Sequence, residues 1–154
     1  MIKFSVARLK KEPIKLAGSE PAEFLEIGEE ELFSVTAPMK YELNLKAVSD
    51  GVLIEGRLST QITGTCARCL EEVTKTITND KLCLFLELTA TDEMDISEDI
   101  RAEMLLELPM TLLCSEDCAG LCPTCGCNLN RESCTCHEQA KGSSCWDALD
   151  NLKL

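Results

Sequence analysis

Apolar and polar residues alternate along much of the first half of the chain with the two-residue period of β-strands. The alternation is clearest over residues 39–64, where Ser49-Asp50-Gly51 interrupts it with a turn of the Asp-Gly type. A third alternating run, residues 72–88, places four leucines on one face: Leu82, Leu84, Leu86 and Leu88. The pattern predicts a long β-hairpin followed by a third antiparallel strand.

The N-terminal residues carry a weaker signal. Ile2, Phe4 and Val6 share one face of a short predicted strand. Residues 10–32 are rich in Lys and Glu and contain four strand breakers, namely Pro13, Gly18, Pro21 and Gly28. We therefore expect this stretch to be mostly connection.

The apolar spacing changes to a helical period after the polar segment 89–95. One face of a helix over residues 96–108 would be apolar and would consist of Ile96, Ile100, Met104, Leu105 and Leu108. Asp95 and Glu98 form a capping-box pattern at the start, and Pro109 predicts the end.

These elements predict an α+β fold: an antiparallel sheet, made of a long hairpin plus a third strand, with one main helix and a cysteine-rich C-terminal segment. We expect the sheet domain to occupy residues 1–109 and the cysteine cluster, for which a metal-binding role is argued below, to occupy 110–140. A short helix is predicted over residues 145–154. Aromatic residues make up only 4% of the chain, so the core must be built from Leu, Ile and Val.

Cysteines are the most informative residues of the chain. There are 11 of them, and seven lie within residues 114–136. Such a density serves disulfides, redox chemistry or metal binding. Disulfides are disfavoured because the count is odd, the cysteines cluster, and residues 1–11 show no apolar segment of an export signal.

Eight cysteines form four close pairs, the usual way in which a chain supplies thiolates to tetrahedral zinc. One site is predicted to consist of Cys122, Cys125, Cys134 and Cys136, which close a local loop. A second is predicted to consist of Cys66, Cys69, Cys114 and Cys118, which would tie the sheet to the segment after the helix. The sequence therefore predicts two structural Zn²⁺ sites.

The remaining thiols and the single histidine have simpler interpretations. Cys83, in a leucine-rich strand, is expected to be a small buried apolar residue. Cys127 and Cys145 are expected to be spare thiols, although either could replace an assigned ligand. His137 directly follows Cys136 and could also substitute as a ligand, but a solvent-facing histidine is favoured.

The residues do not form a recognisable catalytic set. A redox Cys-x-x-Cys normally lies near a βαβ unit and a helix N-terminus, whereas Cys66 and Cys69 lie between two strands. A hydrolytic thiol needs a histidine base, and His137 already lies inside a metal-like cluster. We therefore expect a protein that is not an enzyme.

The formal net charge of −12 disfavours long-range attraction to nucleic acid, which depends on Lys and Arg. Two tetrathiolate zinc sites would lower the charge to about −16. A basic protein is the natural partner of such a surface, although an acidic surface kept for solubility needs no partner. A local basic patch stays open if Arg57, Arg68, Lys75 and Lys81 share one end of the sheet. No apolar run approaches the length of a membrane span, so no membrane partner is expected.

Four motifs of the chain are distinctive together: Thr65-Cys66-Ala67-Arg68-Cys69-Leu70, the helix ending in Leu108-Pro109, the run from Cys114 to Asn130, and Cys134-Thr135-Cys136. They resemble the YceD family, bacterial and plastid proteins linked to accumulation of large-subunit ribosomal RNA. The resemblance covers most of the chain from about residue 40 onward. It departs from the family at Ser143–Trp146, where an Asp-Pro-Arg stretch is usual, and at Cys127, where a small apolar residue is usual.

The resemblance implies a non-catalytic role in large-subunit ribosomal RNA accumulation and ribosome assembly, in the cytoplasm. The implied partner is a ribosomal protein or a pre-large-subunit particle, and direct contact with ribosomal RNA stays open. Two other classes also stay open. One is a zinc-stabilised adaptor or regulatory protein without a ribosomal link, and the other is a thiol-based redox sensor.

Overall fold

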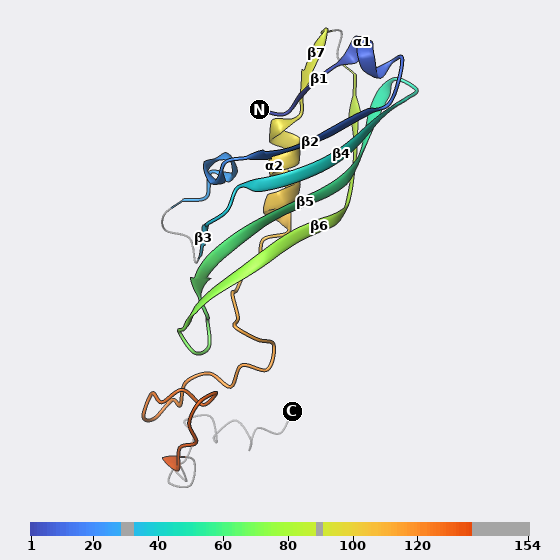
Figure 1. Cartoon of the computed structure of the whole chain (residues 1–154). Helices are drawn as coiled ribbons and strands as arrows, with labels where there is room; N and C mark the ends of the chain where they lie inside the picture. The colour runs from blue at the N-terminus through green and yellow to red at the C-terminus, as the bar shows by residue number, and fades with distance from the viewer. Residues whose placement is uncertain (29–32, 89–90, 137–154) are drawn as a thin grey trace, which may run out of the picture.

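The computed structural model describes residues 1–28, 33–88 and 91–136 (Figure 1). A curved antiparallel sheet forms the body of the molecule, and the main helix crosses behind it in the view of Figure 1. The cysteine-rich segment extends beyond the end of the sheet where the hairpin of the two longest strands turns. The α+β class predicted from the sequence is confirmed.

Three long strands make up most of the sheet. They are β4 (Met39–Val48), β5 (Gly51–Thr65) and β6 (Glu72–Glu87), and each pairs antiparallel with the next. Ser49 and Asp50 form the two-residue turn between β4 and β5, and Ser49 has the positive φ of 52° that primed turns require. Gly51 already belongs to β5, where a Cβ would collide with the ring of Phe85.

Two shorter strands complete this sheet. β2 (Ile14–Glu20) pairs with the outer edge of β4, and β3 (Phe33–Val35) pairs with the end of β5. The expectation that residues 10–32 are mostly connection is therefore wrong for β2. Pro13 and Pro21 flank this strand rather than interrupt it, and edge positions tolerate proline.

The N-terminus forms a second, two-stranded sheet. β1 (Lys3–Ser5) pairs with β7 (Glu93–Asp95), and two short helical turns follow along the chain, α1 (Val6–Leu9) and η1 (Ala22–Leu25). The main helix, α2 (Ser97–Leu106), starts and ends within two residues of the expected range. At its start the Asp95 carboxylate accepts the Ser97 N–H at 2.9 Å.

The core lies between the inner face of the sheet and α2. Its fully buried side chains include Leu25, Met39, Leu45, Ile54, Leu58, Ile96, Ile100 and Met104. Leu, Ile and Val supply most of this core, as expected, and Met39 and Met104 add to it. None of the helices in the described part of the chain is long and apolar enough to span a membrane.

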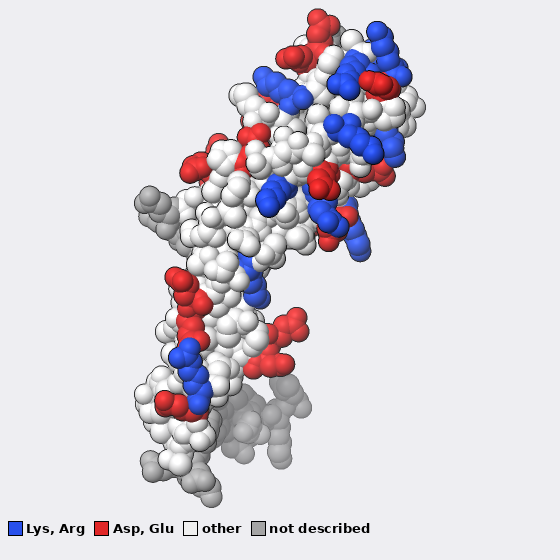
Figure 2. Space-filling model, viewed as in Figure 1, with Lys and Arg blue, Asp and Glu red and all other residues white. Residues whose placement is uncertain are grey.

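The outer face of the sheet corrects the expectation for Cys83 and shows where the basic residues lie. Cys83 is exposed, because strand alternation places it opposite the buried Leu82 and across from Glu55. Arg57, paired with Asp80 at 2.6 Å, lies eight residues before the end of β5, or roughly 26 Å away along the strand. Arg68 lies beyond that end, so the four basic residues that could have formed a patch do not share one end of the sheet. On the face drawn in Figure 2, most of the Lys and Arg lie over the part of the molecule away from the cysteine-rich segment.

Candidate metal centre

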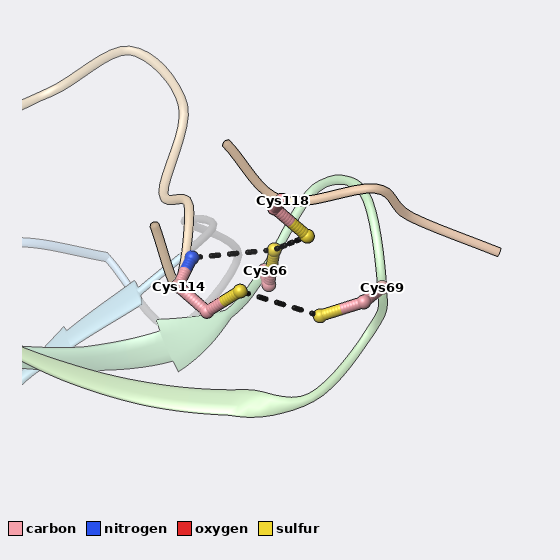
Figure 3. A group of neighbouring side chains, drawn as sticks. All are labelled: Cys66, Cys69, Cys114 and Cys118. Carbon is pink, nitrogen blue, oxygen red and sulfur yellow. Dashed lines mark hydrogen bonds between the residues drawn. The ribbon is translucent and has the colours of Figure 1, made fainter. Parts of the chain in front are cut away.

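The structure brings four of the predicted cysteines together at the end of the sheet. Cys66 and Cys69 come from the turn between β5 and β6, and Cys114 and Cys118 come from the segment after α2. Their sulfurs point toward one another (Figure 3) and all lie within 4.8 Å. We call this group the sheet-tip site.

The sulfur positions of the sheet-tip site fit a tetrahedral metal and do not fit disulfides. Cys66 Sγ lies 3.9 Å from Cys118 Sγ, and Cys69 Sγ lies 3.6 Å from Cys114 Sγ. A zinc ion with bonds of about 2.3 Å to four sulfurs has sulfur–sulfur edges of about 3.8 Å. A disulfide needs about 2.05 Å. The ten cysteines in the described residues are all free.

Backbone N–H groups stabilise the thiolate form of Cys66. The N–H groups of Arg68 and Cys114 lie 3.5 Å and 3.4 Å from its sulfur. Hydrogen bonds from the backbone of Cys69, and then of Arg68 and Cys114, outweigh the effect of burial and lower the pKa of Cys66 to about 6. A sulfur that accepts several N–H bonds is prepared for metal coordination.

The pKa values of the neighbouring thiols, Cys69 and Cys114, shift in the opposite direction. The Glu71 backbone N–H lowers the pKa of Cys69, but burial and hydrogen bonds with the other three thiols raise it to about 12. The pKa of Cys114 is also raised, chiefly by its hydrogen bond with Cys118 and by burial. Four adjacent sulfurs cannot all ionise without a cation, because like charges repel. The site therefore has the chemistry of a cation-binding cluster.

The turn that carries Cys66 and Cys69 is fixed to the later segment by hydrogen bonds to backbone carbonyls of that segment. The Ala67 N–H donates to the Leu112 carbonyl at 2.8 Å, and the Arg68 guanidinium donates to the carbonyls of Glu116 and Cys118 at 3.2 Å and 3.0 Å. These bonds hold the Arg68 guanidinium against the cysteine segment.

The second set of predicted cysteines is grouped as well. Cys122, Cys125, Cys134 and Cys136 have sulfurs that all lie within 4.8 Å, and we call this group the loop site. Gly126 has φ of 76° and donates its N–H to the Cys122 carbonyl at 2.9 Å, which closes the tight turn expected of a metal knuckle. Backbone bonds from Cys125 and Thr124 lower the pKa of Cys122 to about 6.

Cys127 lies beside the loop site without belonging to the group of four. A hydrogen bond with Cys125, burial and a further bond with Cys134 raise the pKa of Cys127 to about 12. It is half-buried, so its role as a spare thiol stays a prediction. His137, Cys145 and the helix predicted over 145–154 lie outside the described residues.

Two asparagines between the cysteine pairs of the loop site have a structural role that was not predicted from the sequence. Asn130 donates its side-chain N–H to Cys118 Sγ at 3.3 Å, and Asn128 donates to the Glu71 carboxylate at 3.1 Å. Burial raises the pKa of Cys118, but bonds from Asn130, Cys114 and the Gly120 backbone lower it overall. Asparagines two residues apart in a loop signal local side-chain turns, and this pattern could have pointed to them.

The cysteine-rich half of the chain matches a known family. Residues 84–153 match the model described as "Large ribosomal RNA subunit accumulation protein YceD". This range contains six of the eight cysteines in the two sites. The chain belongs to the YceD family.

Curated relatives of this YceD chain come from bacteria and plants. An uncharacterized protein of Mycobacterium tuberculosis is 35% identical over 118 residues, which cover 67% of this chain and 57% of the relative. The chloroplastic YCED homolog 1 of Arabidopsis thaliana is 39% identical over 61 residues, covering 40% of this chain and 19% of the plant protein. The corresponding Zea mays protein is 50% identical over 48 residues, covering 30% and 16%.

The YceD chain thus spans little more than half the length of the mycobacterial relatives. Both plant proteins are named for accumulation of the large ribosomal RNA subunit. No solved structure matches the chain significantly.

Proposed function

We propose that this protein is a non-catalytic factor that supports accumulation of large-subunit ribosomal RNA and ribosome assembly in the bacterial cytoplasm. The observation that carries the proposal is the family match over residues 84–153, whose description names this process. The names of the two plant relatives point the same way.

The sheet-tip site and the loop site each hold one structural Zn²⁺ in this proposal. All eight ligands are thiolates, which suits zinc and leaves no open position for a substrate. A closed tetrathiolate site supplies folding energy and not Lewis-acid catalysis. The cysteine segment then acts as a rigid extension of the sheet, and its shape is available for recognition.

The proposed partner is a basic ribosomal protein or a pre-large-subunit particle. The formal charge of −12 favours a basic protein over naked RNA. The separation of Arg57 from Arg68, which lies beyond the end of β5, supports the same choice, because RNA binding needs a continuous basic surface. Contact between such a partner and the acidic surface should weaken as salt rises, since exposed charges are screened beyond about 10 Å at 0.1 M salt.

A deletion strain with plasmid-borne variants tests the function. Loss of the gene should lower large-subunit RNA relative to small-subunit RNA, and the wild-type gene should restore the ratio. Cys69→Ser with Cys114→Ser should fail to restore it, whereas Cys83→Ser, an exposed cysteine outside both sites, should succeed. Normal RNA ratios in the deletion strain at every growth temperature would contradict the ribosomal role.

The same strains separate the proposal from a zinc-stabilised adaptor and from a redox sensor. Co-sedimentation of the tagged protein with pre-large-subunit particles supports the ribosomal role, and its absence favours the adaptor. Protein purified anaerobically with almost no metal would favour the redox sensor, since low-pKa thiols such as Cys66 and Cys122 react readily when they are not coordinated.

A further inference from the structure

The two sites share a short connecting segment. Only three residues separate Cys118, the last thiol of the sheet-tip site, from Cys122, the first thiol of the loop site. Gly120, at φ of 77°, lets this segment approach the β5–β6 turn, where a Cβ would lie 3.2 Å from the Arg68 carbonyl oxygen. The Leu121 N–H donates to that same oxygen at 3.2 Å. The chain therefore enters the second site while still in contact with the first.

A side chain from the loop site reaches a sulfur of the sheet-tip site. Asn130 lies between the two cysteine pairs of the loop site, and its amide nitrogen is 3.3 Å from Cys118 Sγ. Its amide oxygen accepts the Ala119 N–H at 2.8 Å. One side chain thus binds both the sulfur of the other site and the backbone beside it. An N–H donor of this kind stabilises the thiolate form that a metal requires.

Asn130 is held in place by its own loop. The Asn128 side-chain oxygen accepts the backbone and side-chain N–H groups of Asn130 at 3.0 Å and 2.9 Å. Asn128 donates in turn to the carboxylate of Glu71, which also pairs with Arg131 at 2.8 Å. Glu71 is the last residue before β6, in the turn between β5 and β6. The loop is therefore bound to the same turn that carries Cys66 and Cys69.

We propose that the two sites take up metal cooperatively and that Asn130 carries the coupling between them. Closure of the loop site around its metal fixes Asn130, and the fixed amide stabilises the Cys118 thiolate of the sheet-tip site. By linkage, metal in the sheet-tip site raises the affinity of the loop site by the same factor. One prearranged hydrogen bond to a charged sulfur corresponds to a coupling of about tenfold. This inference rests on the metal-binding role proposed above.

Zinc competition with a chromophoric chelator, on the full chain under reducing anaerobic conditions, measures the coupling. Three proteins are needed: the wild type, a chain with only the sheet-tip site (Cys125→Ser, Cys134→Ser) and a chain with only the loop site (Cys69→Ser, Cys114→Ser). The product of the two affinities in the intact chain should exceed the product of the two single-site affinities by about tenfold.

Introducing Asn130→Ala into all three proteins should bring this ratio to about one. Asn130→Asp keeps the acceptor for the Ala119 N–H but removes the donor to Cys118, so it should also abolish the excess. Glu132→Ala, an exposed residue of the same loop, is the matched control and should keep the tenfold ratio.

Two results would overturn the inference. A wild-type ratio near one means that the sites load independently, and a tenfold ratio that survives Asn130→Ala means that another contact couples them. Failure of every protein to bind zinc is a distinct result, because it contradicts the metal-binding role itself.

Discussion

The sheet and the cysteine segment contrast in what lies at their centres. In the sheet, side chains such as Leu45, Ile54 and Leu58 are 0% exposed and pack against α2. In residues 110–136, Leu112 is the one large hydrocarbon side chain that is fully buried. The other buried side chains there are those of Cys118 and Cys122. The first region has a hydrophobic core, whereas the second has two groups of sulfur atoms.

This difference determines how each region responds to change. Each buried Leu or Ile contributes about 1.5–3 kcal/mol to the sheet, and this contribution does not depend on any ligand. A segment of fewer than about 40 residues without such a core usually needs a metal or disulfides to fold. The cysteine segment therefore depends on its thiols, and the following changes should affect the two regions separately.

The largest effect is expected from loss of a thiol in the sheet-tip site. Cys66→Ser should reduce bound zinc from about two to about one per chain and release the segment after α2 from the sheet, because this site joins distant parts of the chain. Metal analysis of the purified protein measures the loss. Cys83→Ser is the control and should keep both metals, since Cys83 is exposed on the outer face. Loss of a metal from the control, or none from Cys66→Ser, would refute the ligand assignment.

A core substitution should affect the sheet and spare the metal content. Leu58 is 0% exposed on the central strand β5, so Leu58→Ala should lower the free energy of unfolding by about 2–5 kcal/mol through lost burial and a cavity. Urea unfolding checks this, with Val48→Ala, at a residue 42% exposed, expected within about 0.5 kcal/mol of wild type. Equal effects of the two substitutions would show that the core has been misidentified.

The smallest effect concerns the start of α2. Bonds from the Ser97 hydroxyl and N–H, with a smaller influence of Lys3, lower the pKa of Asp95 from its ordinary value. A lowered pKa in the folded state means that the stabilisation is present above about pH 4 and is lost as the pH falls further. Asp95→Ala should therefore cost about 0.5–1 kcal/mol at pH 7 and less near pH 3.

Thermal unfolding at several pH values, with Asp92→Ala as a neighbouring exposed control, measures this dependence. A cost for Asp95→Ala that grows as the pH falls would contradict the sign.

Local patterns predicted the elements whose signal lies within one stretch of sequence. The alternation in 39–64 and 72–88 corresponds to β4, β5 and β6, because one face of each strand is less exposed than the other. Close spacing of cysteine pairs similarly anticipated the two groups of four sulfurs. In both cases residues close in sequence form one structural feature, so their spacing predicts it.

Elements that depend on distant partners were missed or misjudged. β2 buries only Ile14, so its sequence shows little alternation of apolar and polar residues. Its strand conformation depends on pairing with β4. Cys83 was misjudged because its leucine neighbours occupy the other face of β6. The spacing of Asn128 and Asn130 indicates a local turn. The bond of Asn130 to Cys118 could not be predicted from it, because Cys118 belongs to a different site.

Hydrogen exchange on the full chain, with and without chelation of its metal, tests most directly whether metal holds the cysteine segment together. Metal removal should abolish protection of the Ala67, Leu121, Gly126 and Leu129 amides, which bond across the segment or to the turn of the sheet. Amides in the β4–β5 ladder should keep their protection, because the core of the sheet contains no metal ligand. Readdition of zinc should restore the lost protection. If the segment stays protected after complete metal removal, or if the sheet opens together with it, the account is contradicted.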